Sequence, residues 1–95
     1  MEHNYSYPLD PSWSTAEIVT VIKMLRTVED AYEVGTTTER VLTDYRHFKE
    51  VVSTKAGEKQ LGRKFAKLSG YQLYDVVQAA KNATGKKVKL EVNKR

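Results

Sequence analysis

The chain has 95 residues, of which 40% are hydrophobic and 29% are charged, with a formal net charge of +4 and no cysteine. This length and composition predict one folded domain and exclude a largely disordered chain, and the lack of cysteine excludes disulfide bonds and thiolate sites. Because no apolar run reaches the roughly 18 residues of a membrane span and the N-terminus lacks signal-peptide features, we expect a cytoplasmic protein with no membrane partner.

Residues 1–13 show no helical periodicity and predict an ordered arm that lies over the domain. Pro8 and Pro11 hold this segment extended. The run Pro8-Leu9-Asp10-Pro11 also has the spacing of a polyproline recognition motif, which would require a free and exposed arm. The aromatic side chains around it favour packing against the domain instead. These aromatic residues are Tyr5, Tyr7 and Trp13.

The spacing of apolar residues predicts a first helix over residues 15–33. Ser14 and Glu17 stand at the spacing of a capping box, in which each side chain accepts a hydrogen bond from the other residue's backbone N–H. Trp13 and Ile18 flank this cap at the positions of a hydrophobic staple. The apolar stripe consists of Ile18, Val21, Ile22, Leu25, Val28 and Tyr32, and Gly35 follows as a terminator.

Three further helices are predicted, over residues 37–52, 55–68 and 71–83. Short loops connect them, so consecutive helices must be near neighbours, either antiparallel or folded at a corner. Their apolar stripes are Val41, Leu42, Tyr45, Phe48 and Val52, then Leu61, Phe65 and Leu68, then Leu73, Val76, Val77 and Ala80. The sequence therefore predicts an all-α fold, a compact four-helix domain over residues 1–85.

The ends of these later helices also carry capping signals. Thr36 and Glu39 repeat the capping-box spacing before the second helix, and the side chain of Ser53 can cap the third. Ser69 and Gly70 break the third helix. Gly85 is expected to end the fourth.

Residues 86–95 are predicted to form a basic tail. Residues 81–95 hold six Lys or Arg and one acid, whereas the rest of the chain has a net charge of −1. Val88, Leu90 and Val92 alternate with polar residues as in a strand. A lone strand needs a partner, and three apolar side chains are too few to offset the entropy of ordering the segment. We therefore expect a disordered or weakly held tail that can be deleted, or a strand that pairs with a second chain.

Residues 62–81 have the spacing of a helix-turn-helix, with Ala66, Gly70 and Val76 at its small, turn and apolar positions. In this interpretation the fourth helix would enter a DNA groove and expose Gln72, Leu73, Tyr74, Val77, Gln78 and Lys81. Several of these side chains are poor readers of base edges. A helical corner at Gly70 is therefore favoured, and burial of the apolar residues of the fourth helix would exclude a readout helix.

The third helix carries a row of four basic residues spaced four apart. Like charges at this spacing repel one another, and only Glu58 lies near enough to offset them. The row is either a solvated face or a face that binds an anionic partner. Its members are Lys55, Lys59, Arg63 and Lys67.

Candidate catalytic and metal-binding residues are few. The two histidines are His3, in the arm, and His47, three residues after Asp44 on the second helix. Asp44 and His47 could share a helix face, but no nucleophile completes the pair, and a surface ion pair is the simpler interpretation. No set of ligands has a recognised metal-binding spacing. We therefore expect no catalytic residue, no cofactor and no metal.

Two parts of the chain carry a resemblance to known proteins, which covers about residues 4–81. The residues that carry it are Asn4-Tyr5-Ser6-Tyr7-Pro8-Leu9-Asp10, Ser12-Trp13-Ser14-Thr15 and Glu17-Ile18-Val19, then Ser69-Gly70-Tyr71, Tyr74, Val76-Val77 and Ala80-Lys81. They resemble the YktA-like family of uncharacterised proteins from Gram-positive bacteria. The resemblance implies an all-helical fold and no assigned activity, and it carries over no catalytic residues.

These observations favour a non-enzymatic interaction or regulatory protein with an unidentified protein partner, acting as a monomer or a small homo-oligomer. The alternative is a nucleic-acid-binding module that uses the corner in residues 62–81, the basic row and the tail. An enzyme is the third hypothesis.

Overall fold

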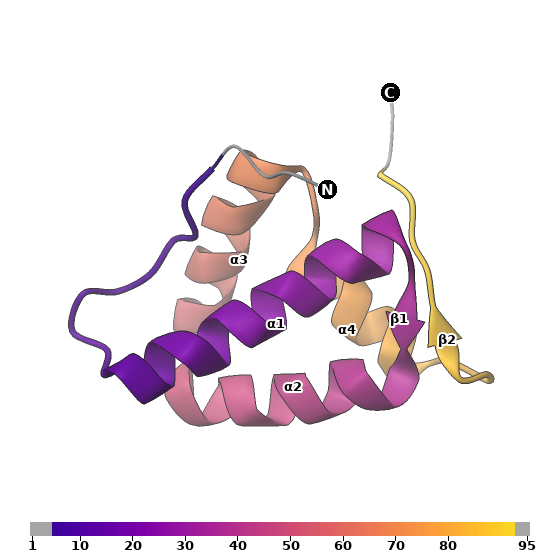
Figure 1. Ribbon diagram of the computed structural model, residues 1–95, viewed down its shortest axis with the longest axis horizontal. Coiled ribbons are helices and arrows are strands. Elements are labelled where there is room, and N and C mark those ends of the chain that lie inside the picture. Colours follow the sequence, from indigo (N-terminus) through magenta and orange to yellow (C-terminus); the bar gives the residue numbers. More distant parts are fainter. Residues whose placement is uncertain (1–4, 93–95) are drawn as a thin grey trace.

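Helices account for most of the computed structural model, which describes residues 5–92 (Figure 1). The helices in this range are α1 (Thr15–Glu33), α2 (Thr38–Val51), α3 (Lys55–Ser69) and α4 (Leu73–Lys81), with strands β1 (Thr36–Thr37) and β2 (Lys87–Val88). The all-α fold class is confirmed, and each helix begins and ends within two residues of the expected position. His3 and Asn4, and the end of the predicted tail at residues 93–95, lie outside the described range.

The helices α1 and α2 run in opposite directions, one packed on the other (Figure 1). The helix α3 crosses the end of this pair where α2 finishes, and α4 lies behind it and packs mainly on α2. Gly70 permits the corner between α3 and α4, because it ends α3 in the left-handed conformation with φ of 83°.

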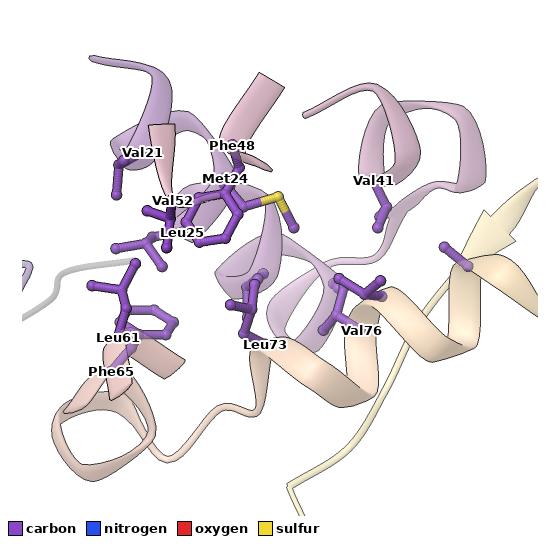
Figure 2. Close-up of a cluster of buried hydrophobic side chains, with 14 of the residues drawn as sticks. Val21, Met24, Leu25, Val41, Phe48, Val52, Leu61, Phe65, Leu73 and Val76 are labelled. Carbon is purple, nitrogen blue, oxygen red and sulfur yellow. The ribbon is translucent and has the colours of Figure 1, made fainter. Parts of the chain in front are cut away.

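The core collects one face of every helix, as Figure 2 shows. Met24, Phe48 and Phe65 are among its largest wholly buried side chains. The apolar stripes predicted most core positions, but they missed Met24 and wrongly included Leu42 and Leu68, which are exposed. Leu42 is rotated by about 100° around α2 from the residue before it, which is buried. Leu68 lies in the last turn of α3.

The arm packs against the domain through its aromatic residues. The hydroxyl of Tyr7 donates a 2.9 Å hydrogen bond to Oε1 of Glu29, and the hydroxyl of Tyr5 donates to Oε2 of the same carboxylate. Both rings also pack on Phe65, at centroid distances of 6.0 and 6.3 Å. Trp13 is half-buried against the core. The polyproline motif therefore belongs to a packed segment and not to a free one.

Burial and the neighbouring carboxylate act on both tyrosines of the arm. Burial, followed by the hydrogen bond to Glu29, raises the pKa of Tyr7 to about 12, although nearby Arg26 opposes this effect. The same two causes raise the pKa of Tyr5 well above its usual range. Glu29 itself lies within α1 and is buried. A buried carboxylate that accepts two phenolic hydrogen bonds therefore fastens the arm to α1.

The cap of α1 agrees with the sequence, but the next two caps are shifted by one residue. Ser14 and Glu17 form both hydrogen bonds of the capping box, at 2.9 and 3.2 Å. Thr37 and not Thr36 caps α2, and its side chain accepts a hydrogen bond from the backbone N–H of Arg40. Thr54 and not Ser53 caps α3, and its Oγ1 accepts a hydrogen bond from the backbone N–H of Gly57.

The tail joins a sheet within its own chain, so the expectation that it lacks a partner is wrong. Residues 36–37 and 87–88 form an antiparallel ribbon in which Thr36 faces Val88 and Thr37 faces Lys87. Val88 is buried in the core. The connection between α1 and α2 supplies the missing strand, which helical periodicity could not reveal because β1 is only two residues long.

Further hydrogen bonds hold the residues on either side of the ribbon. The backbone N–H of Leu90 donates to the carbonyl of Ala31 in α1 at 2.9 Å, and Thr38 bonds the carbonyls of Gly85 and Lys86. Gly85 does not end α4, as the sequence suggested, since that helix ends at Lys81. The segment after α4 is therefore anchored to α1 and to the start of α2.

Candidate functional site

A groove of about 780 Å³ lies between α3 and α4, and Tyr45 of α2 also lines it. We call it the α3–α4 groove. Its size falls within the range of about 300–1,000 Å³ found for ligand sites in proteins. The residues that line it are Tyr45, Lys55, Ala56, Glu58, Lys59, Gly62, Arg63, Ala66, Gln72, Leu73, Tyr74, Val77, Gln78 and Lys81.

The structure divides the basic row that the sequence predicted. All four of its side chains are exposed, but only Lys55, Lys59 and Arg63 line the groove, whereas Lys67 does not. Lys81 on α4 adds a further cation to the lining. No ion pair within residues 5–92 joins any of these groove cations to a carboxylate. The groove therefore presents a set of unneutralised positive charges.

Glu58, the one carboxylate of the lining, is already held by α2. It accepts hydrogen bonds from the hydroxyl of Tyr45 at 2.9 and 3.2 Å and from Nζ of Lys49 at 2.8 Å. Burial and the hydrogen bond to Glu58 raise the pKa of Tyr45 to about 12. Glu58 therefore offsets the charge of Lys49 and leaves the basic row without a counter-ion.

Lys81 is positioned by an aromatic ring. Its Nζ lies 5.5 Å from the centroid of the Tyr45 ring, a cation–π contact that leaves the ammonium group without a fixed anion. Tyr45 also donates its hydroxyl to Glu58, so one aromatic side chain from α2 connects α3 and α4 at this end of the groove.

The floor of the groove is apolar because its side chains are small or belong to the core. Leu73 and Val77 are buried, and Gly62 also lines the groove. A Cβ at Gly62 would lie 3.7 Å from Cδ2 of Leu73, in ordinary contact, and would raise this floor. Tyr74 stands at the edge of the groove with 67% of its surface exposed. An exposed aromatic residue beside an apolar floor is typical of binding surfaces.

The readout-helix interpretation of α4 is wrong. Leu73 and Val77, which it required to be exposed, are both buried, as is Ala80. The face of α4 that would enter a DNA groove therefore belongs to the core, because α4 packs on α2 and α1 through it. Tyr74 and Lys81 are exposed, as that interpretation required, but they face the α3–α4 groove.

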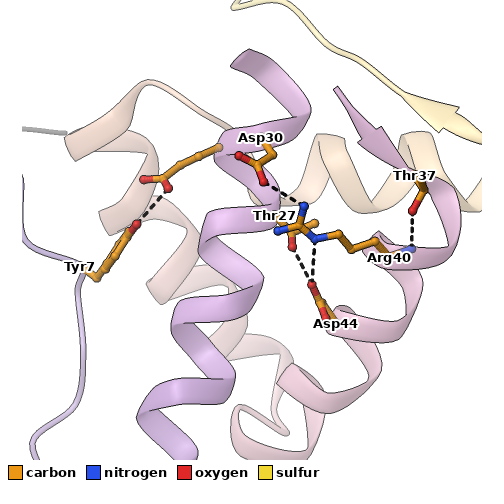
Figure 3. A network of polar contacts seen from close by, with 7 residues as sticks. Tyr7, Thr27, Asp30, Thr37, Arg40 and Asp44 are labelled. Atoms are coloured by element: carbon orange, nitrogen blue, oxygen red, sulfur yellow. Dashed lines mark hydrogen bonds and ion pairs between the residues drawn. The ribbon is translucent and has the colours of Figure 1, made fainter. Parts of the chain in front are cut away.

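Asp44 and His47 do not form the ion pair suggested by their spacing. Asp44 accepts a 2.6 Å hydrogen bond from Thr27, which is wholly buried, and lies 3.7 Å from Nε of Arg40. Figure 3 shows Arg40 between Asp44 and Asp30, with its Nη1 2.9 Å from the latter. His47 is exposed. This network therefore joins α1 to α2.

No group of three or more His, Asp or Glu side chains within residues 5–92 is arranged to hold a metal ion. No helix in that range is long and apolar enough to cross a membrane.

Sequence reasoning combined α4 with the basic row only as a nucleic-acid-binding corner, and it missed that the two helices enclose a groove. Tyr74, Gln78 and Lys81 recur at helical spacing on the side of α4 away from its buried stripe, which is a signal the sequence contains. That this side faces α3 depends on the corner at Gly70.

Comparison with known proteins extends over nearly the whole chain. A relative from Streptococcus gordonii is 55% identical over 82 residues, which is 86% of this chain and 89% of the relative. One from Listeria monocytogenes is 47% identical over 87 residues, 92% of this chain and 97% of the relative. Both are described as UPF0223 proteins, and the profile of that family matches residues 4–89, which extends past the expected end of the resemblance and includes β2. The chain therefore belongs to the uncharacterised protein family UPF0223.

Proposed function

We propose that the protein is a non-enzymatic interaction or regulatory protein of the cytoplasm that binds an anionic protein partner through the α3–α4 groove. The observation that carries this proposal is the row of Lys55, Lys59 and Arg63, which faces the groove together with Lys81 and has no carboxylate counter-ion in the described chain. Four like charges on adjacent helices repel each other, so an anionic partner relieves a cost that the free protein bears.

The chemistry of the lining supports recognition more than catalysis. Among the described residues that line the groove, none is a serine, threonine, cysteine or histidine, so a Ser, Thr or Cys nucleophile with a histidine base is not assembled there. The lining carboxylate, Glu58, is occupied by Tyr45 and Lys49. What remains is a set of cations around an apolar floor.

Nucleic-acid binding is the alternative function, and one observation favours it. Lys67 extends the basic row beyond the groove along α3, as a phosphate-tracking surface would require. With Leu73 and Val77 buried, such binding would have to use phosphate contacts and not base readout by α4.

The test is affinity capture from the native cell with three baits that differ only at the surface. Wild-type protein is compared with a triple variant, Lys59→Glu, Arg63→Glu and Lys81→Glu, and with Lys67→Glu. We expect a protein that the wild type and Lys67→Glu retain and the triple variant loses, and that survives nuclease treatment. Retention of the same proteins by all three baits would contradict the proposal, and a nuclease-sensitive capture that also weakens with Lys67→Glu would favour nucleic acid.

A further inference from the structure

We propose that the occupant of the α3–α4 groove is an acidic amphipathic helix of a partner protein. This inference rests on the proposed function and deepens it, because it specifies the shape and charge pattern of the partner. Three features of the groove support it: the period of its cations, the chemistry of its floor, and the way this chain uses its own acidic residues.

The first feature is that the cations repeat with the period of a helix. Lys55, Lys59 and Arg63 are spaced four residues apart on α3, so their attachment points rise by about 6 Å from one to the next. A second helix lying along α3 places carboxylates at its own i, i+4 and i+8 positions with that same interval. Each basic side chain can therefore meet one acidic side chain without distortion of either helix.

The opposite wall has a matching row. Tyr74, Gln78 and Lys81 stand at i, i+4 and i+7 on α4, and all three line the groove. The groove is thus bounded by two helical rows, one cationic and the other mixed aromatic, amide and cationic. A guest helix about 10 Å across lies between these rows and inserts only one edge.

The second feature is the floor, which suits apolar side chains. Leu73 and Val77 form part of it, and the small residues Gly62 and Ala66 keep it open. The exposed ring of Tyr74 offers further apolar surface at the rim. Phosphates gain nothing from such a floor, whereas the i, i+3, i+4 and i+7 anchors of an amphipathic helix bury their apolar area there.

The third feature argues against a second copy of this chain as the source of that helix. The acidic residues of α1 already have partners within the protein. Asp30 pairs with Arg40 at 2.9 Å, Glu29 accepts from the arm, and Glu33 accepts from the hydroxyl of Tyr71 at 2.8 Å. No described helix of this chain carries three acidic residues at i, i+4 and i+8, so the acidic row comes from a different protein.

The probe for this proposal is a fluorescent peptide of roughly 18 residues, long enough to form a helix in a binding groove. It carries leucine at i, i+3, i+4 and i+7 with glutamate on both flanks. A control peptide has the same composition with the leucine positions scrambled. We expect binding by the first peptide at physiological salt, and at least about tenfold weaker binding by the control.

Variants of the full chain then locate the site. Arg63→Glu and Lys67→Glu change the net charge equally, on the same helix, but only Arg63 lines the groove. We expect Arg63→Glu to weaken peptide binding by at least about tenfold and Lys67→Glu by less than about threefold. Tyr74→Ala, at an exposed position that the fold does not need, provides a second test and is expected to weaken binding about tenfold. Circular dichroism checks that each variant is folded.

Several results would overturn the proposal. These are equal losses with Arg63→Glu and Lys67→Glu, equal binding of the scrambled peptide, displacement of the peptide by single-stranded oligonucleotides at lower concentration than by unlabelled peptide, or no peptide binding. A photo-crosslinking residue at Gln78 in the native cell separates the two levels of inference. If Arg63→Glu abolishes a crosslinked adduct but the peptide does not bind, the proposal of an acidic helix is rejected and the proposed function is retained. If neither the crosslinked adduct nor peptide binding is observed, both the acidic helix and the proposed function are rejected.

Discussion

Val88 lies directly opposite Thr36 in the antiparallel ribbon, with both side chains buried. This pair joins the last described segment of the chain to the connection between α1 and α2. Leu90 extends the attachment through its hydrogen bond to Ala31. The C-terminal segment is therefore part of the folded unit, and its removal has an energetic consequence that can be measured.

We predict that Val88→Ala lowers the free energy of unfolding by about 2 kcal/mol, since it removes apolar volume from the buried core. Val92→Ala is the matched control. Val92 belongs to the same alternating series but is 43% exposed, so its loss is expected to change stability by less than about 0.5 kcal/mol. Chemical denaturation measures both. Equal effects would mean that Val88 is not held in the core.

Truncation after Gly85 is the stronger form of the same prediction. It removes the ribbon, the buried side chain of Val88 and the hydrogen bond from Leu90, so we expect a larger loss than with Val88→Ala. An unchanged denaturation midpoint would show that the segment is not required and would restore the interpretation of it as a loose tail.

The arm offers a second prediction. Tyr7→Phe removes the hydrogen bond to Glu29 but keeps the ring on Phe65, and we expect a loss of about 1.5 kcal/mol, the lower end for hydrogen bonds to charged groups. Tyr74→Phe removes a hydroxyl from an exposed ring and is expected to have no measurable effect on stability. If Tyr7→Phe were as neutral as Tyr74→Phe, the carboxylate would not fasten the arm.

The contact between α1 and α2 gives a third prediction. Thr27→Val keeps the shape of a wholly buried side chain but removes the hydroxyl that donates to Asp44 at 2.6 Å. We expect a loss of about 1.5–2 kcal/mol by thermal denaturation. Thr20→Val is the control, because the hydroxyl of Thr20 donates to the carbonyl of Ala16 in its own helix and not to another helix. A loss of similar size in Thr20→Val would assign the effect to the valine and not to Asp44.

Stability is predicted to fall at alkaline pH. The pKa of Tyr7, Tyr45 and Tyr71 is raised to about 12 in the folded protein, by burial first and then by a hydrogen bond to a carboxylate. The unfolded chain releases these protons near pH 10, whereas the folded chain retains them. Stability is therefore fully present below about pH 10 and decreases as pH rises from about 10 to 12.

Thermal melting between pH 8 and pH 12 measures this decrease, and tyrosinate absorbance follows the titration itself. The variant Tyr7→Phe lacks one of the titrating groups, so its melting temperature should depend less steeply on pH above about 10. A melting temperature that stays constant across this range would contradict the prediction, as would tyrosines that all titrate near their usual pKa in the folded protein.

The helices were predictable because each depends on local signals. The capping box at Ser14 and the glycines at Gly35 and Gly70 are read directly from neighbouring residues, and the structure retains all three. The ribbon was not predictable by the same means. β1 is two residues long and has no period of its own, and its partner lies at the other end of the chain, so only the tertiary fold brings Thr36 to Val88.

The candidate site was likewise predictable only in part from the sequence. The basic row on α3 follows from residue spacing alone, but its division into residues inside and outside the groove depends on where α4 lies. The carboxylate that seemed able to offset the row, Glu58, is turned toward Tyr45 and Lys49 on another helix. Glu58 is three residues from Lys55 in sequence, yet it pairs with a residue of another helix, which sequence spacing does not reveal.

Both ends of the described chain are fastened to the same stretch of α1, the arm at Glu29 and the C-terminal segment at Ala31. A ribosome delivers these two attachments at very different times. The arm emerges first, and Val88 and Leu90 emerge only after the four described helices. The connection at β1 therefore lacks its partner strand while the helices emerge, so the ribbon can form only late in vectorial folding.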